Sequence, residues 1–172
     1  LKIAREEQKP ILDWYVEQRW SPQAIREAHH PFRGVLEVIR WFQIQPNTYI
    51  GLNTGRPEKI REETLRSINH LGEAYRVKFS GDLLYMNTGN WAGAVRDTKV
   101  AGVQHFMDAG YRVFAMIDNE PDNLRAIAEM MSEEEILFLH ADTLFESKRT
   151  RLPRNTARGN DYDLTDLIPE KA

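Results

Sequence analysis

The chain contains no cysteine. This absence excludes disulfide bonds, thiol catalysis and zinc sites with cysteine ligands, and it fits a cytoplasmic protein. The sequence has no glycine-rich phosphate loop, which argues against the nucleotide-binding α/β domains that use one. No apolar run approaches the roughly 18 residues of a membrane span, and no signal-peptide pattern is visible. We therefore expect no membrane contact.

The chain also has no excess of positive charge. Its formal net charge is −3, which argues against a dedicated nucleic-acid binder. The 172 residues, 41% of them hydrophobic and 28% charged, are enough for one domain with a substantial core. Nothing in the composition fixes the oligomeric state, and a homo-oligomer is compatible with it.

Short apolar runs alternate with helical patterns along the chain, which predicts an α/β fold. The expected strands are 48–52, 75–79, 83–86, 112–117 and 136–140. We expect a three-layer, Rossmann-like arrangement, with a mostly parallel sheet and helices on both faces. The expected divisions are a helical amino-terminal segment (1–33), an α/β core (34–147) and an irregular carboxyl-terminal tail (148–172).

The amino-terminal segment has two predicted helices. Pro10 marks the start or a kink of the first helix, and Ser21-Pro22 is a helix-opening pair for the second. His29 and His30 are adjacent, and adjacent residues on a helix do not face each other. A solvated helix end is therefore a better interpretation of this pair than a metal site.

Two acidic residues follow the apolar run 112–117. Asp118 ends this predicted strand, and Pro121 opens a helix that contains Asp122. Ligands of open α/β sheets bind at the carboxyl ends of the strands. A hard cation such as Mg²⁺ would relieve the repulsion between two carboxylates on so short a turn. The alternative is that both acids simply cap the helix, whose amino end favours negative charge.

Two further features lie at the predicted carboxyl ends of strands. Residues 53–57 are expected to form a polar turn between strand 48–52 and a helix that starts at Pro57, so that backbone N–H groups and the Thr54 hydroxyl face an anion. Lys99 lies near the start of a helix predicted at 95–109, where a positive charge opposes the helix dipole. Ordinary turns and solvated surface lysines are the alternatives. His140 and Asp142 lie at the carboxyl edge of strand 136–140, where they could approach the same face or merely end that strand.

The order of these features resembles the haloacid dehalogenase-like hydrolase superfamily, most members of which are Mg²⁺-dependent phosphatases. Residues 52–57 resemble its second motif, whose threonine, here Thr54, holds a phosphoryl oxygen. Lys99 resembles the lysine of the third motif, and residues 118–122 resemble the acidic fourth motif. The resemblance covers 32–140. It implies that Thr54, Gly55, Arg56 and Lys99 bind phosphate, with Thr54 and Lys99 catalytic, and that Asp118 and Asp122 hold Mg²⁺.

The first motif of that superfamily, an apolar strand ending in Asp-x-Asp, is not found. Asp13 follows a short apolar run, but Tyr15 takes the place of the second aspartate. Asp161 and Asp163 have the right spacing, but the stretch before them is too polar for a core strand. In the superfamily this strand lies mid-sheet, between the strands of the second and fourth motifs. We therefore expect a strand before Leu1, with 1–33 as a small cap-like helical insertion after it, or another segment in the same place.

These expectations combine into one functional hypothesis and one rival. The hypothesis is a Mg²⁺-dependent phosphohydrolase that cleaves phosphate esters through an aspartyl-phosphate, with the nucleophile upstream of Leu1. Its substrate is a phosphorylated compound that the sequence does not identify. The rival is a catalytically silent domain of the same fold with a binding, regulatory or assembly role. An apolar strand ending in Asp-x-Asp upstream of Leu1 would favour the hydrolase.

Overall fold

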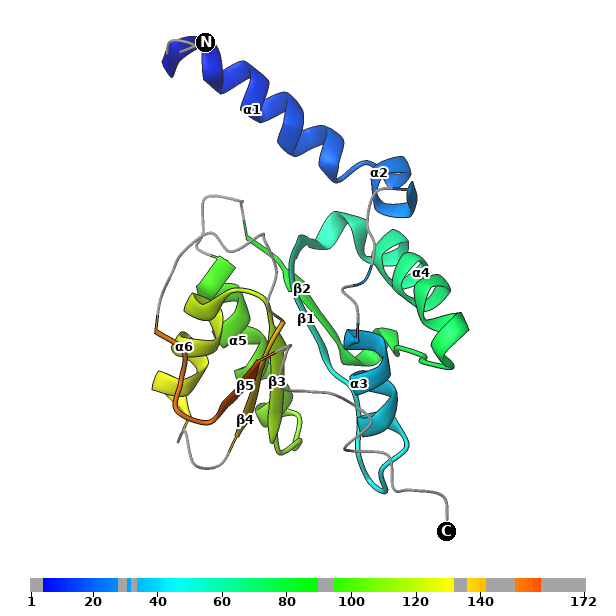
Figure 1. Cartoon of the computed structure of the whole chain (residues 1–172). Coiled ribbons are helices and arrows are strands. Elements are labelled where there is room, and N and C mark those ends of the chain that lie inside the picture. Colours follow the sequence, from blue (N-terminus) through cyan, green and yellow to red (C-terminus); the bar gives the residue numbers. More distant parts are fainter. Residues whose placement is uncertain are drawn as a thin grey trace.

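A computed structural model describes residues 5–27, 31, 34–89, 95–131, 136–141 and 151–158. The amino-terminal segment is helical, as expected: α1 (Arg5–Arg19) contains Pro10, and α2 (Pro22–Glu27) follows it. Ser21 caps α2, because its Oγ accepts a hydrogen bond from Ala24 N at 3.2 Å. In Figure 1 α1 and α2 lie beyond the end of β1 (Leu52–Pro57), and α1 points away from the rest of the molecule.

The described strands form two separate parallel sheets (Figure 1). In the first sheet β1 pairs with β2 (Leu84–Asn87). In the second, β4 (Leu137–His140) lies between β3 (Ala115–Asp118) and β5 (Thr156–Arg158). Because every pair is parallel and helices connect the strands, the chain has the expected α/β class.

Helices separate the strands along the chain. They are α3 (Val35–Gln43), η1 (Glu58–Ile60), α4 (Arg61–Gly72), η2 (Glu73–Tyr75), η3 (Gly81–Leu83), α5 (Val95–Asp108) and α6 (Pro121–Met130). Helix α5 contacts β1, β2 and α6, while α6 also contacts β3 and β4. Gly110, with φ of 90°, ends the α5 segment, as the sequence predicted.

The core consists of three apolar clusters. The cluster between α5, α6 and β4 contains Val103, Leu124, Ile127, Ala128, Ile136 and Phe138. A second cluster joins α3 to the region of Val77 and Phe79 and contacts Leu52 of β1. The third joins α2 to β2 through Ile25, Ile60, Leu84 and Met86, with Trp20 packed against it. The third cluster therefore holds the amino-terminal helices at the carboxyl end of β1.

The position of the first core strand differs from the prediction. The sequence predicted a strand at 48–52 and a turn at 53–57, but β1 occupies Leu52–Pro57 and the α-helix starts at Arg61. The pairing of β1 with β2 begins at Leu52, because β2 itself begins at Leu84, the residue that pairs with Leu52. Pro57, which has no N–H to donate, is tolerated at the end of the strand. Residues 48–51 have no strand partner among the described residues.

The predicted strand at 75–79 is also wrong. Tyr75 ends η2, and Arg76 has a φ of 56°, which interrupts an extended run. The backbone of Phe79 pairs with a side chain instead, donating to Asn69 Oδ1 at 2.7 Å and accepting from Asn69 Nδ2 at 3.1 Å. An amide side chain offers the same donor and acceptor as a neighbouring strand, so Phe79 is satisfied without one.

The carboxyl-terminal tail contributes to the fold. The sequence predicted a mostly irregular tail from 148, yet 156–158 form β5 and add a third strand beside β4. The polar composition of this stretch suits an edge strand, which period-based reasoning does not detect in three residues. Among the described residues, no helix is both long and apolar enough to cross a lipid bilayer.

Candidate functional site

Lys99 connects the two sheets, since it contacts β1 near the start of the strand and β3 at its carboxyl end. Its Nζ lies 2.6 Å from the backbone oxygen of Asn53 in β1 and 2.8 Å from Asp118 Oδ2 at the end of β3. The side chain of Lys99 is 13% exposed and that of Asp118 is 4% exposed. An ammonium group has three hydrogens, and the described residues supply acceptors for two of them. The structure thus brings together two of the predicted site residues.

The surroundings of Asp118 fix its carboxylate. Oδ1 accepts hydrogen bonds from Glu120 N at 2.9 Å and from Asn123 Nδ2 at 3.1 Å, while Oδ2 faces Lys99. Asn123 lies in the first turn of α6 and is itself buried. These bonds hold the turn between β3 and α6, although the backbone N–H that Asp118 accepts from belongs to Glu120, the N-cap residue, rather than to the first turn of α6.

Asn53 and Gly102 place Lys99, and the sequence analysis singled out neither. Asn53 Nδ2 donates to the backbone oxygen of Lys99 at 2.6 Å, so strand and helix are joined by two reciprocal bonds. A Cβ atom at Gly102 would overlap the Asn53 side chain. Glycine at this position of α5 therefore allows the close approach of α5 to β1. A glycine inside a predicted helix was the available signal.

The predicted phosphate-binding residues 54–56 lie within β1 rather than in a turn. Thr54 follows Asn53 directly, and its Oγ1 accepts a hydrogen bond from Arg56 N at 3.2 Å. Gly55 lies against Val95 at the start of α5, where a Cβ would come within 2.9 Å of Val95 Cγ1. All three residues are partly buried. The structure places Thr54 next to the Lys99 contact, but their roles in binding phosphate stay predictions.

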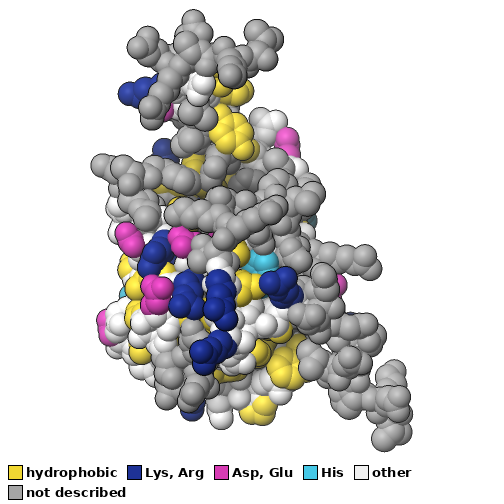
Figure 2. Space-filling view, turned by 60° about the vertical axis from the view of Figure 1, so that its left-hand side comes forward, with side chains coloured by type: hydrophobic (Ala, Val, Ile, Leu, Met, Phe, Trp, Pro, Cys, Tyr) yellow, Lys and Arg dark blue, Asp and Glu magenta, His cyan; other side chains and the backbone are white. Residues whose placement is uncertain are grey.

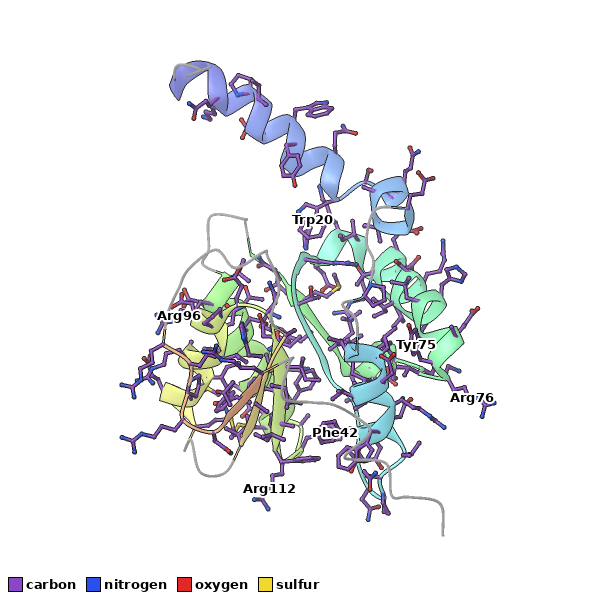
Figure 3. All side chains as sticks on the ribbon, in the orientation of Figure 1. Trp20, Phe42, Tyr75, Arg76, Arg96 and Arg112 are labelled. Atoms are coloured by element: carbon purple, nitrogen blue, oxygen red, sulfur yellow. The ribbon has the colours of Figure 1, made fainter. Side chains whose placement is uncertain are left out.

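Arg56 joins the amino-terminal segment to the end of β1. Its Nη1 lies 3.4 Å from Thr64 Oγ1 in α4, and its Cζ lies 5.8 Å from the centre of the Trp20 ring. Burial lowers the pKa of the Arg56 guanidinium from its ordinary value, because desolvation disfavours the charged form. Figure 3 shows Trp20 between α2 and the upper end of β1.

The expected Mg²⁺ ligands are Asp118 and Asp122. Protein donors engage both oxygens of Asp118, and Asp122 lies partly buried in the first turn of α6. Within the described ranges, no three His, Asp or Glu side chains are grouped so that they could hold a metal ion. Mg²⁺ requires near-octahedral oxygen coordination. The described residues alone therefore do not make a complete Mg²⁺ site.

Of the histidines considered in the sequence, the structure describes His140 alone. His140 is buried, and its Nε2 lies 3.2 Å from the backbone oxygen of Asn119. It is in register with Asp118 of β3 and Arg158 of β5, so it lies at the expected edge. His29, His30 and Asp142 lie outside the described residues, as do Asp161 and Asp163.

An apolar cleft separates β1 from β3. Its volume is about 610 Å³, and its walls include 47–53 on one side and 110–117 on the other. Val35, Ile39 and Phe42 of α3 and Val103 and Phe106 of α5 also line it. The cleft ends at Asn53 and Ile117, one residue before Thr54 and Asp118. It leads directly to the Lys99 contacts.

A second hollow carries positive charge. Arg125, Arg151, Leu152 and Arg154 line a space of about 310 Å³ next to α6 and β5. Figure 2 shows Lys and Arg side chains gathered on this face, with acidic side chains beside them. The chain therefore combines a net charge of −3 with a local basic patch. Arg151 and Arg154 are close in the sequence, but Arg125 comes from α6, so no single motif predicted the patch.

Comparisons with protein-family models, with curated proteins and with solved structures found no match for this chain.

Proposed function

We propose that this chain belongs to a haloacid dehalogenase-like phosphohydrolase, with its reaction site where Lys99 joins β1 to the carboxyl end of β3. The single observation that carries the proposal is the position of Lys99, whose Nζ contacts both Asn53 O and Asp118 Oδ2. A buried lysine shared between two strands, next to a threonine, supplies the donors that a phosphoryl group requires.

In this proposal the residues of the chain bind and orient the phosphate. Lys99 provides the positive charge for the phosphoryl oxygens, since one of its three hydrogens has no acceptor among the described residues. Thr54 provides a hydroxyl beside it, and Gly55 and Arg56 follow at the end of β1. Asp118 holds the ammonium in place, because its Oδ2 lies 2.8 Å from the lysine Nζ.

Mg²⁺ belongs to the proposal as a cation held by Asp118 and Asp122. Bound Mg²⁺ would neutralise charge on the phosphate and orient it. Because both oxygens of Asp118 are already engaged by protein donors, we propose that metal binding needs further carboxylate ligands from another segment. The same segment would supply the aspartate nucleophile, which splits hydrolysis into two easier steps through an aspartyl-phosphate.

We also propose that the two parallel sheets are halves of one sheet in a three-layer, Rossmann-like fold. The missing strand would lie upstream of Leu1 and end in Asp-x-Asp. Support comes from the cleft between β1 and β3, whose carboxyl end opens beside Lys99 and Asp118. A phosphorylated substrate in the cytoplasm remains part of the proposal, and so does the possibility of a homo-oligomer.

The test compares two proteins in the hydrolysis of an aryl phosphate with Mg²⁺. The 172-residue chain alone should show no turnover, and the chain extended through its native upstream coding region should hydrolyse the ester. Asp118→Asn and Lys99→Met should each abolish this activity in the extended chain. The exposed variant Arg96→Met, on the same helix as Lys99, should retain it. Turnover by the short chain that survives Asp118→Asn would contradict the mechanism.

The silent-domain rival has its own supporting observation. Within the described residues the Asp118 carboxylate is fully engaged, because each of its oxygens already has a protein donor. The Lys99–Asp118 pair can therefore serve as a structural connection between the sheets without any ligand. Inactivity of both proteins toward a broad panel of phosphate esters would favour this rival.

A further inference from the structure

We infer that the hollow between α6 and the segment 151–155 is a binding site for a polyphosphate group, meaning two or more linked phosphates. Arg125 of α6 lines the hollow, together with Arg151, Leu152 and Arg154 of that segment. The proposed reaction site uses none of these residues. The inference therefore goes beyond the proposed function and does not depend on it.

The backbone of the segment 151–155 is held against the core. Leu152 packs against the apolar cluster between α5, α6 and β4, and Pro153 is buried. Thr156 Oγ1 donates a hydrogen bond to Pro153 O at 2.8 Å, which closes a short turn at the start of β5. These contacts fix the part of the chain that carries two of the three arginines in the lining.

Asn155 connects the same segment to β4 and to the residue before it. Its Nδ2 donates to Ile136 O at 2.9 Å, and its backbone oxygen accepts a hydrogen bond from Phe138 N at 2.9 Å. Arg151 and Arg154 therefore extend from a backbone whose position is set by the sheet. A site whose parts are positioned in advance binds its ligand with a smaller loss of conformational entropy.

Arg125 reaches the hollow from the opposite side, from α6. Its Nε lies 3.4 Å from Glu129 Oε1, one turn further along the helix, and its side chain is 38% exposed. Glu129 Oε2 lies 3.0 Å from Arg96 Nη2 of α5, so the carboxylate is itself held between two helices. Glu129 thus orients the guanidinium of Arg125 through Nε, while the Nη atoms carry further N–H donors.

Phosphate is the anion that this lining favours. The planar guanidinium of arginine donates to two oxygens of one phosphate at once. Three cations around one space repel one another, and an anion between them relieves this repulsion. Basic side chains gather on one face of the molecule (Figure 2). Apart from Leu152 the lining of the hollow is arginine, so recognition depends on charge rather than on apolar contact.

The charge and the size of the hollow favour linked phosphates over a single one. A phosphate monoester carries about 1.5 to 2 negative charges at pH 7, fewer than the positive charges of three arginines. The volume of about 310 Å³ lies near the lower limit for ligand pockets, which suits a compact group. A nucleic acid requires basic residues along an extended surface, and the net charge of −3 opposes its approach.

The experiment is an NMR titration of the 172-residue chain with inorganic pyrophosphate, at an ionic strength of about 0.15 M, which screens long-range attraction. The amides of Arg125, Arg151 and Arg154 should shift in a saturable manner. Inorganic phosphate should bind there at least about tenfold more weakly, because it lacks the charge-assisted hydrogen bonds of the second phosphate group. Equal affinity for the two anions would overturn the inference, and so would the absence of saturable shifts at these amides.

Variants of the arginines test the lining directly. Arg151→Met and Arg154→Met should each raise the Kd of pyrophosphate at least about tenfold. Both side chains are exposed, so these variants should fold, which the remaining amides check. Arg154→Lys should raise the Kd less than Arg154→Met, because lysine keeps the charge but lacks the planar fork.

The matched control removes the same charge elsewhere. Arg66 of α4 is 65% exposed and pairs with Glu63, so Arg66→Met should change the Kd of pyrophosphate by less than about twofold. Equal rises in Arg66→Met and Arg151→Met would show that pyrophosphate is attracted by overall charge alone, and this result would overturn the inference.

The position of the shifts separates this inference from the proposed function. Shifts confined to Thr54, Lys99 and Asp118 would overturn the arginine site and leave the proposed function standing. With inorganic phosphate, shifts confined to the arginines of the hollow would support the arginine site and contradict phosphate binding at Lys99.

Two further ligands identify the source of the phosphate group. Tighter binding of a nucleoside diphosphate than of pyrophosphate, with loss of that binding in Arg151→Met, would support the site and assign it to a nucleotide. Equal or weaker binding of the nucleoside diphosphate would support the site and assign it to pyrophosphate or inorganic polyphosphate. Tighter binding of a single-stranded oligonucleotide than of either would overturn the inference, because the surface would then be a nucleic-acid interface.

Discussion

At the scale of single residues, the contact between Lys99 and Asp118 joins the two sheets at the candidate site. Both side chains are largely removed from water, so each buried charge is stabilised mainly by the opposite charge beside it. Asn123 and the backbone of Glu120 complete the acceptor sites of Asp118. An exposed pair on the neighbouring helices, Arg96 and Glu129 at 3.0 Å, has no such dependence, because water solvates both of its members.

The first prediction concerns this difference. Lys99→Met should lower the free energy of unfolding by about 3–5 kcal/mol, because it leaves the Asp118 carboxylate buried without its cation. The double variant Lys99→Met with Asp118→Asn should be less destabilised than the sum of the single variants. Arg96→Met should cost under about 1 kcal/mol. Urea denaturation checks all four proteins, and equal losses for Lys99→Met and Arg96→Met would contradict our description of the pair.

The second prediction concerns Gly102. Alanine usually stabilises a helix relative to glycine by up to about 1 kcal/mol. At Gly102 the added Cβ would overlap the Asn53 amide, so Gly102→Ala should instead destabilise by about 1–3 kcal/mol. Gly89→Ala is the control, since its Cβ would meet Asn87 Oδ1 at an ordinary 3.4 Å. Stabilisation by Gly102→Ala in urea denaturation would show that α5 and β1 are not in close contact.

At the scale of elements, the sequence predicted helices better than strands. Helix α5, predicted at 95–109, and the start of α6 at Pro121 lie where the helical pattern and the proline signal placed them. The first strand was predicted at 48–52, several residues before its actual position. Of this run only Leu52 pairs with β2, because β2 begins at the residue opposite Leu52. The residues of a strand that form ladder hydrogen bonds are determined by where the neighbouring strand begins and ends. The sequence of one strand alone does not contain this information.

The third prediction tests the side chain that replaces a strand at Phe79. Asn69→Ala leaves the buried N–H and C=O of Phe79 without their partner and should cost about 1–3 kcal/mol. Asn69→Asp keeps the acceptor for Phe79 N but loses the donor to its oxygen, so an intermediate loss is expected. Thermal unfolding of both variants measures the order. Equal stability of wild type and Asn69→Ala would contradict the pairing.

At the scale of the whole molecule, the arrangement of the candidate site was only partly predictable. Strand ends in a parallel sheet meet at one edge, so the sequence indicated that Lys99 and Asp118 approach each other. It did not indicate Asn53, Gly102 or Asn123, because their roles depend on contacts between α5, β1 and α6 that no local pattern encodes. The sequence predicted one mostly parallel sheet, whereas the described strands form two.

The central claim is our proposal that Lys99, between β1 and the carboxyl end of β3, binds phosphate. Its most direct measurement is an NMR titration of the 172-residue chain with inorganic phosphate, which follows the amides of Thr54, Lys99 and Asp118. We predict saturable shifts at these amides in the wild type and in Arg96→Met, and their loss in Lys99→Met, whose fold is checked from the remaining amides. Saturable shifts that persist in a folded Lys99→Met variant, or that occur only at other residues, would contradict the claim.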